Sequence, residues 1–389
     1  MRCCLYISSS TTTSSCCRTL FQSFEMFEER PEALCMQMCP QSEIRFRNRN
    51  GLVHILETDT PLTKTGPLQT KAKAITVRSR RVICASGGNQ RRPATRKGNP
   101  LKMVKQYSRS AAGKEKLSPT ELRPFAVLMD TVAYLLRVVS EYDSREAWPD
   151  VYEFVSDRLR AVRQDMVVEN LDAEKSILLL ESMIPFYAEA EYRCELTRCP
   201  TYDRKLHATQ LEECFCRWRQ FVDFSERKNE RIMASYLLHN ADKRWVVVQL
   251  IAWKEHFCKN NYTFIQDVIL SLRMNNFVRF FRLISQQDDS LLRLDMLVVT
   301  YNTLTTTRYF ATMRLLALKA CAVAYRCRGI PLPDAFLEEH LHMKHSALLC
   351  CLRALGCEVT DGKAYTFGVT LSNDVDLCAS EWIFADFIP

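Results

Sequence analysis

The sequence predicts an all-α protein, a helical-hairpin (TPR-like) solenoid capped by a C-terminal winged helix. From residue 119 to residue 328, apolar residues recur at spacings of three and four. Only 10 of the 389 residues are glycine, which is few for a fold built on strands or on glycine-rich nucleotide loops. Near residue 330 the pattern changes to two short helices and a hairpin. The expected segments are a flexible leader (1–30), an N-terminal motif segment (31–59), a disordered basic linker (60–98), a helical-repeat domain (99–328), a winged helix (329–370) and a C-terminal tail (371–389).

The linker carries the basic character of the chain. Residues 60–98 are rich in Gly, Pro, Lys and Arg and show little apolar periodicity, so they cannot bury enough surface to become ordered. Between residues 60 and 118 there are 15 Lys and Arg against one acid, Glu115, whereas the whole chain has a net charge of +8. Such a stretch attracts nucleic acid, acidic partners or import receptors.

The helical-repeat domain is expected to begin just after Ser118. Ser118 and Pro119 supply a cap and a first-turn proline for a helix whose apolar stripe runs from Phe125 to Val139. Helices joined by short turns pack as antiparallel neighbours, and a row of them without a sheet forms a solenoid or an irregular bundle, of which we favour the solenoid. The further helical patterns cover 151–166, 173–191, 208–224, 228–240, 244–259, 263–274, 277–287, 289–303 and 306–328.

The winged helix is predicted from three consecutive elements. After Pro331, one short helix is expected over residues 335–341 and a second over about 345–355, where Gly356 ends it. The segment CEVTDGKAYTF then places two short β-like runs around Asp361-Gly362, which is a strong hairpin signal. Two helices followed by a hairpin are typical of a winged helix.

Cysteine usage indicates a reducing compartment. The 18 Cys are scattered, and several, such as Cys214, Cys321 and Cys350, fall in apolar helical patterns. A chain of this length needs no disulfide staples, so we expect reduced, mostly buried thiols. The sequence shows no secretory signal and no apolar run near the ~20 residues of a membrane span. We therefore expect a soluble protein of the nucleus or cytoplasm.

Motifs that carry chemistry are largely missing, and we expect no enzyme, cofactor or metal. Gly113-Lys114 fails as a phosphate loop because position 108 is Ser and position 115 is Glu, which would repel phosphate. Cys35 and Cys39 have no second pair at zinc-finger spacing, and His340, His342 and His345 match no metal motif. A thiol enzyme is a minor alternative that would need a Cys with a lowered pKa beside a His.

Basic side chains are the candidate nucleic-acid contacts. Those of the linker would neutralise phosphates without reading sequence. The alternatives are a solvated linker or import signal, a solvated helix face, and a winged helix that binds protein. The candidates are Arg78, Arg80, Arg81, Arg91, Arg92, Arg96 and Lys97 in the linker, Arg158, Arg160 and Arg163 on the polar side of a helix, and Lys344, Arg353 and Lys363 on the winged helix.

Several motifs, in the same order, resemble those of the Sac-three/GANP family. They cover about residues 33–57 and 99–368. Relatives join these two parts more briefly, so the resemblance implies an insertion between them. The motifs are MCPQSEIRFR, with Met38, Cys39, Pro40, Glu43 and Arg47, then KMVKQYSRSAAGKEKLSPTELRPFAVLMDTVAYLL, YEFVSDRLRAVRQDM, RCPTYDRKLHATQLEEC and NNYTFIQDVILSLRMNNFVRFFRLI.

The resemblance implies a non-enzymatic scaffold of PCI-type architecture, with helical hairpins capped by a winged helix. Long members of the family scaffold a nuclear-pore-associated mRNA-export complex. There, this region pairs with a second PCI-type protein and a small acidic subunit, and the assembly binds nucleic acid. The chain is most similar to the short members linked to centrosome duplication and spindle assembly. We therefore expect centrosomal partners first and the export role, with RNA or DNA binding, as the alternative.

Overall fold

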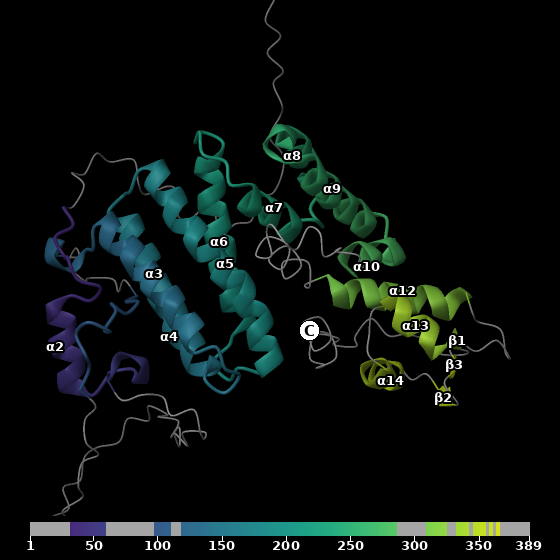
Figure 1. Ribbon diagram of the computed structural model, residues 1–389, viewed down its shortest axis with the longest axis horizontal. Coiled ribbons are helices and arrows are strands. Elements are labelled where there is room, and N and C mark those ends of the chain that lie inside the picture. The colour runs from purple at the N-terminus through teal and green to yellow at the C-terminus, as the bar shows by residue number, and fades with distance from the viewer. Residues whose placement is uncertain are drawn as a thin grey trace, which may run out of the picture.

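Helices make up most of the described part of the computed structural model, as the sequence predicts. The structure describes residues 32–59, 97–109, 118–285, 309–324, 332–341, 345–354, 358–360 and 363–365. Within these ranges the helices form a row that crosses the molecule from the N-terminal motif to the C-terminal sheet (Figure 1). The prediction of an all-α helical stack is therefore confirmed. Among the described helices, none is both long and apolar enough to cross a membrane.

Four long helices build the first half of the row. Each packs on the next one in the chain, and short turns join them, so neighbours run antiparallel. Residues in the left-handed conformation, Asn170 (φ 51°) and Arg198 (φ 52°), follow the ends of the second and third of these helices. The four are α3 (Phe125–Glu141), α4 (Trp148–Val168), α5 (Ala173–Thr197) and α6 (Arg204–Val222).

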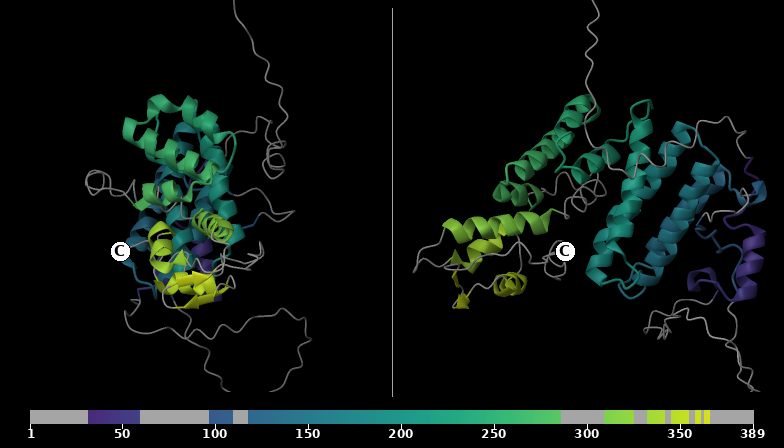
Figure 2. Two further views of the ribbon diagram at one scale, coloured as in Figure 1. Left: turned by 90° about the vertical axis from the view of Figure 1, so that its right-hand side faces the viewer. Right: turned by 180° about the vertical axis from the view of Figure 1, so that it is seen from behind.

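Shorter helices continue the row. Seen from behind, they lead from α6 toward the C-terminal elements (Figure 2). They are α7 (Glu230–His239), α8 (Val246–Ala252), α9 (Lys259–Arg273), α10 (Phe277–Ser285) and α12 (Phe310–Ala324). Helix α8 packs on α9, α9 packs on α10, and α10 packs on α12.

The C-terminal elements combine two helices with a small antiparallel sheet. Strand β3 lies in the middle, with the register Leu332↔Ala364 on one side and Val359↔Ala364 on the other. The predicted hairpin is therefore present, whereas the winged helix as a whole stays a prediction. The elements are β1 (Leu332–Pro333), α13 (Asp334–Leu341), α14 (His345–Ala354), β2 (Glu358–Thr360) and β3 (Lys363–Tyr365).

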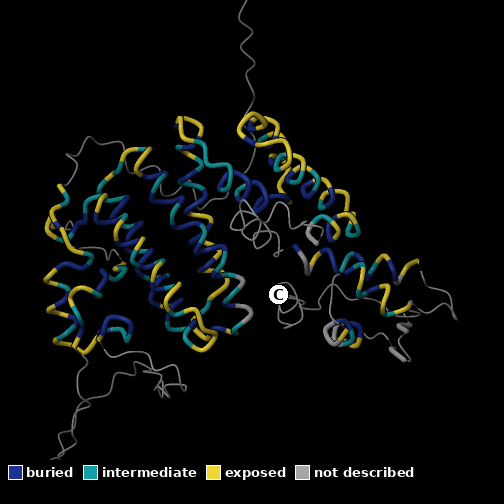
Figure 3. The backbone as a smooth tube through the Cα atoms, in the orientation of Figure 1, coloured by how far each residue is buried: buried dark blue, intermediate teal, exposed yellow. Residues whose placement is uncertain are grey.

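One continuous hydrophobic core runs through the row. It begins at Leu56 and Leu128, and it includes Leu337 and Leu352 of the C-terminal helices. Figure 3 shows the buried residues along the sides of the helices that face one another. The C-terminal elements therefore share the core of the helical stack instead of hanging from it as a separate domain.

The structure corrects two of the predicted elements and adds two others. Pro119–Glu121 is a separate 3-10 turn, and α3 begins only after Pro124, because a proline favours an extended conformation in the residue before it. The expected helix over 244–259 ends at Ala252 and is followed by a 3-10 turn at Lys254–His256. Strand β1 and helix α2 (Gln41–Asn50) were not predicted. The expected helix over 289–303, the leader (1–30), the C-terminal tail (371–389) and linker residues 60–96 lie outside the described residues.

Candidate functional site

The N-terminal motif forms a compact unit on the surface of α4. Gly51, in the left-handed conformation (φ 67°), ends α2, and the chain then turns into a 3-10 turn at Ile55–Glu57 that lies on α4. Residues 97–109 return to the same place, and a Cβ atom at Gly98 would lie 2.6 Å from the Met103 sulfur, so a larger residue there would have to displace the Met103 side chain.

The two ends of the basic linker meet on this unit. The Asn99 amide donates to the Glu57 carbonyl (2.8 Å), and the Asn99 side chain donates to the Asp59 carboxylate (2.7 Å). Residues 60–96 therefore leave and re-enter the fold at one point, as an insertion must if it is not to disturb the surrounding packing.

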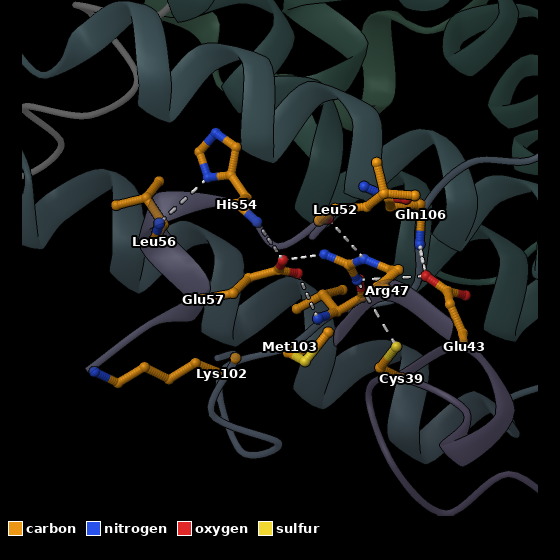
Figure 4. Close-up of polar contacts among 12 residues, drawn as sticks. Cys39, Glu43, Arg47, Leu52, His54, Leu56, Glu57, Lys102, Met103 and Gln106 are labelled. Atoms are coloured by element: carbon orange, nitrogen blue, oxygen red, sulfur yellow. Dashed lines mark hydrogen bonds and ion pairs between the residues drawn. The ribbon is translucent and has the colours of Figure 1, made fainter. Parts of the chain in front are cut away.

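Glu57 is the centre of the first of two buried ion clusters (Figure 4). Its carboxylate pairs with the Arg47 guanidinium on one side and, at 3.2 Å, with the Arg158 guanidinium of α4 on the other. The backbone amides of His54 and Val104 donate to the same carboxylate, each at a distance of 3.1 Å. All four carboxylate hydrogen bonds thus come from different parts of the unit, which ties α2 and residues 97–109 to α4.

Asp165 is the centre of the second cluster. Its two oxygens accept from the Lys105 ammonium and from the Arg123 guanidinium, both at 2.7 Å. Lys105 also donates to the Glu121 carbonyl (2.7 Å), and Arg123 donates to the Met38 carbonyl (3.2 Å). The cluster therefore joins α4 to the segment before α3 and to the N-terminal motif.

The positive and negative charges of the two clusters balance. Four cations, from Arg47, Arg158, Lys105 and Arg123, face Glu57, Asp165 and two further acids at the edges. Those two acids are Glu43, which accepts from the Gln106 amide (2.9 Å), and Asp157, which accepts from the Tyr107 amide (3.3 Å). Burial raises the pKa of the Glu43 carboxyl, and the Gln106 amide and Arg47 oppose this. Loss of one partner from a buried pair of this kind leaves an uncompensated charge inside the fold, which is strongly destabilising.

The comparisons with known proteins fall on this same region. The model of the SAC3/GANP family matches residues 38–361, which is most of the chain and begins at the motif methionine. The chain belongs to the SAC3/GANP family. Two relatives are protein xmas of Drosophila melanogaster, 29% identical over 236 residues, and SAC3 family protein B of Arabidopsis thaliana, 24% identical over 271 residues. These alignments cover 57% and 64% of the chain but only 11% and 14% of the relatives, so the chain corresponds to a small part of each.

The motif residues that carry the family resemblance lie in and around the Glu57 cluster. Arg47 is its main cation, and Glu43 lies at its edge. Pro40 precedes the first turn of α2, and the Met38 carbonyl accepts from Lys105 and Arg123. Cys39 is buried 4.0 Å from Arg47, and burial raises the pKa of its thiol. In this SAC3/GANP chain the motif therefore has a structural role.

Two of the three arginines predicted on the polar side of α4 are buried, and that prediction is wrong for them. Arg158 belongs to the Glu57 cluster, and Arg163 donates to the Gln210 carbonyl (3.0 Å) and to Glu213 (3.1 Å) of α6. Arg160 is half-buried, with its guanidinium 4.0 Å from the centre of the Tyr107 ring. Arginines are amphipathic, so a pattern of charges alone does not tell a solvated face from a buried pair.

The remaining basic candidates are only partly described. Lys97 and Arg353 are exposed, and Lys363 begins strand β3. The linker arginines from Arg78 to Arg96, and Lys344, lie outside the described residues. Nucleic-acid contacts through these side chains stay a prediction.

Within the described residues, one group has donor atoms close enough to hold a metal ion. Asp334, Glu338 and His345 place one ligand atom each within 4.8 Å of one another, between the starts of α13 and α14. The His345 ring nitrogen already contacts Glu338 (2.5 Å) and Asp334 (3.5 Å). These contacts account for the group as a surface hydrogen-bond cluster, and no metal is assigned to it.

The expectation of mostly buried thiols is confirmed for the described part of the chain, and their reduced state stays a prediction. Of the eight described cysteines whose side chains are placed, six are buried. Cys214 lies 3.5 Å from Arg163, and burial raises the pKa of its thiol. Cys199 differs, because the pKa of its thiol is lowered to about 6. The groups responsible are a neighbouring thiol, a hydroxyl and backbone amides, and so they differ from the histidine that the thiol-enzyme alternative calls for.

A buried histidine makes stability depend on pH. His207 of α6 lies between the Tyr187 carbonyl (2.7 Å from Nε2) and the Tyr152 hydroxyl (3.2 Å from Nδ1). A neutral ring with its proton on Nε2 donates to the Tyr187 carbonyl and accepts from the Tyr152 hydroxyl. Burial lowers the pKa of His207 because it disfavours the charged ring. The unfolded chain therefore takes up a proton below about pH 6.5 that the folded chain resists.

We expect the free energy of unfolding to fall as the pH drops from 7 to 5. The contribution of His207 is fully present above the unfolded pKa, near 6.5, and is lost below it, with a slope of at most about 1.4 kcal/mol per pH unit. Urea titrations at several pH values, on the wild type and on His207→Gln, would isolate this contribution as the difference between the two slopes. Equal slopes would contradict it.

The sequence analysis missed the acids at the centres of both clusters. Glu57 and Asp165 were not singled out, although Asp165 stands between Val162 and Met166 in an otherwise apolar stripe. An acid inside an apolar stripe is a usable signal of a buried ion pair, since Asp is rarely buried without a partner. For Glu57, the signal was its place three residues after His54, with which it forms a capping box.

Proposed function

We propose that this SAC3/GANP chain is a non-enzymatic scaffold that acts through protein partners. The observation that carries the proposal is the use of its charged groups: the titratable side chains of the N-terminal motif pair with one another inside the fold. Binding surface is available outside, where Phe224, Val248, Ile251 and Met274 are 87%, 69%, 61% and 74% exposed. Where exposed apolar side chains are contiguous, they mark surfaces that bind other proteins.

The C-terminal helices and sheet are the proposed docking surface for a second PCI-type protein together with a small acidic subunit. Arg353 is exposed on α14 and faces away from the shared core, so it is free to meet an acidic partner. Helix α14 also contacts β2, so a partner bound to α14 would lie beside the sheet.

Charge reversal at this surface should weaken partner capture. With a tagged chain as bait, we expect Arg353→Glu to recover at least about tenfold less of the acidic partner, because a like charge now faces it. The matched control is Lys205→Glu, an exposed cation on the distant helix α6, which should leave capture unchanged. Quantitative mass spectrometry of the two purifications measures the ratio, and equal recovery would contradict the proposed surface.

The proposed cellular role is centrosome duplication and spindle assembly, with the protein in nucleus and cytoplasm and at the centrosome. The second candidate is an mRNA-export adaptor. It is supported by the two relatives, both of which are several times longer than the chain, as the export scaffolds of the family are. Fluorescent tagging separates the two roles, since foci at spindle poles support the first and a rim at the nuclear envelope supports the second.

The export role also requires nucleic-acid binding, which the linker can test. Since Asn99 is hydrogen-bonded to both Glu57 and Asp59, the two ends of the linker lie close together, and residues 60–96 can be replaced by a short Gly-Ser bridge without moving the fold. This removes nine Lys and Arg. If the linker binds phosphates, affinity should drop alike for all sequences, and the salt dependence of binding should become shallower by about 0.9 per lost duplex contact. Unchanged RNA binding, at an unchanged melting temperature, would exclude this role for the linker.

A further inference from the structure

The turn between α5 and α6 brings two cysteines together. Arg198 takes the left-handed conformation (φ 52°), and the Cys199 amide then donates to the Cys194 carbonyl (3.0 Å). The next part of the turn folds back in the same way, as the Tyr202 amide donates to the Cys199 carbonyl (3.1 Å). The backbone therefore holds Cys199 next to the last turns of α5.

Hydrogen-bond donors converge on the Cys199 sulfur. The Cys194 thiol, the Thr201 hydroxyl at 3.3 Å, and the backbone amides of Thr201 and Tyr202 all bond to it. Donors of this kind stabilise a thiolate over a thiol. They lower the pKa of Cys199 to about 6, with the Cys194 hydrogen bond as the largest cause, although burial acts in the opposite direction.

Cys194 is held in place as the partner of this thiolate. Its sulfur accepts a hydrogen bond of 3.3 Å from the Trp148 indole nitrogen, and its side chain is only 1% exposed. The Arg193 guanidinium covers the other side of the same indole, 3.8 Å from the ring centre. Cys199 is 7% exposed, and the two residues that follow it, Pro200 and Thr201, are exposed.

We propose that Cys194 and Cys199 are a reversible redox pair, in which hydrogen peroxide or a similar small peroxide converts the two hydrogen-bonded thiols into an intramolecular disulfide. The Cys199 thiolate attacks one peroxide oxygen, so that an S–O bond forms, the O–O bond breaks, and the leaving hydroxide takes a proton to become water. Cys194 then attacks the sulfenic sulfur, so that the S–S bond forms, the S–O bond breaks and a second water leaves. Two electrons pass from the sulfurs to the peroxide, and a thiol such as glutathione reverses the change.

The pair differs from the other described thiols. Cys39 and Cys214 are buried, and burial raises the pKa of both, so they hold their protons at neutral pH. Cys258 is exposed and serves as an internal reference for access of a reagent. The proposed modification thus has one target within the described part of the chain, at the joint between two of the longest helices.

The first measurement is the pH dependence of alkylation, followed cysteine by cysteine with mass spectrometry on the folded wild type. Absolute rates are a poor guide, because a thiolate of low pKa is also a weaker nucleophile. The midpoint is decisive: we expect half-maximal alkylation of Cys199 near pH 6, against about 8.5 for an ordinary thiol. A midpoint at pH 8 or above would overturn the proposal.

Two substitutions of Cys194 test whether its thiol donates a hydrogen bond to the Cys199 sulfur. Cys194→Ala removes the thiol donor and should raise the Cys199 midpoint, whereas Cys194→Ser keeps an O–H donor and should leave it low. An unchanged midpoint in Cys194→Ala would show that Cys194 does not contact the Cys199 sulfur, which contradicts the pairing. Melting temperatures of both variants would confirm that each remains folded.

The second measurement is the product of oxidation. One equivalent of peroxide should convert the wild type to a species 2 Da lighter that carries the Cys194–Cys199 disulfide and that dithiothreitol restores. In Cys194→Ser the reaction should stop at a sulfenic acid on Cys199, which dimedone traps. Oxidation of Cys199 to sulfinic acid in the wild type, or a disulfide between other cysteines, would overturn the proposal.

Discussion

Replacement of Glu57 by glutamine should lower the free energy of unfolding by about 3–5 kcal/mol. The change keeps the shape of the side chain and removes its charge. Arg47 and Arg158, which are 1% and 3% exposed, would then lie inside the fold without the carboxylate that both now contact. The loss is large because a buried guanidinium cannot recover its hydration unless the unit opens.

The matched control lies two positions further along the chain. Asp59→Asn makes the same change of acid to amide, but Asp59 is exposed and pairs only with Asn99 and Lys102 at the surface. We expect no loss of stability that denaturant titration can resolve, because solvent screens exposed pairs. If Glu57→Gln and Asp59→Asn unfolded at the same denaturant concentration, the Glu57 cluster would not stabilise the fold.

Truncation of Trp148 should have an effect of similar size for a different reason. The Trp148 side chain is fully buried where α3, α4 and α5 meet, against Tyr152 and Phe186, and its indole nitrogen bonds to Cys194. Trp148→Ala would leave a cavity that rigid helices on all sides cannot close, so we expect a loss of about 3–5 kcal/mol in the free energy of unfolding.

Trp245 provides the control for this change. Its side chain is 41% exposed at the start of α8 and contacts Tyr236 on one side only. Trp245→Ala should therefore cost about 1 kcal/mol or less, since surface substitutions have small effects. Urea titrations of the two alanine variants give the comparison. A cost at Trp148 no larger than that at Trp245 would mean that the helices do collapse around the vacancy.

The helices of the repeat domain could be predicted well because their signal is local. The stripe of α3, for example, places Leu128, Val132 and Leu135 on one face, and all three are buried. The predictions failed where contacts with distant parts of the chain outweighed the local sequence pattern. Helix α2 was missed because its residues are mostly polar, and its buried residues are only Ile44 and Arg47, which do not form an apolar stripe.

The function of the charged residues could not be predicted in the same way. Arg353 stands among apolar neighbours in the sequence and Arg158 among charged ones, yet Arg353 is exposed and Arg158 is buried. The difference comes from Glu57, which lies 101 positions before Arg158 in the chain. No periodicity reports a contact over such a distance, so the candidate nucleic-acid residues on α4 were assigned to the wrong side.

The sequence by itself determined the helical architecture, the position of the C-terminal hairpin and the family to which the chain belongs, because each depends on residues that are close together in the chain. Only the tertiary structure decided which charges are buried and which cysteines meet. Lys105 and Asp165 are 60 positions apart, and they pair because the fold removes both from water and leaves Asp165 as the counter-charge that Lys105 contacts. That choice is made when the helices pack, since in the unfolded chain water solvates every one of these groups equally well.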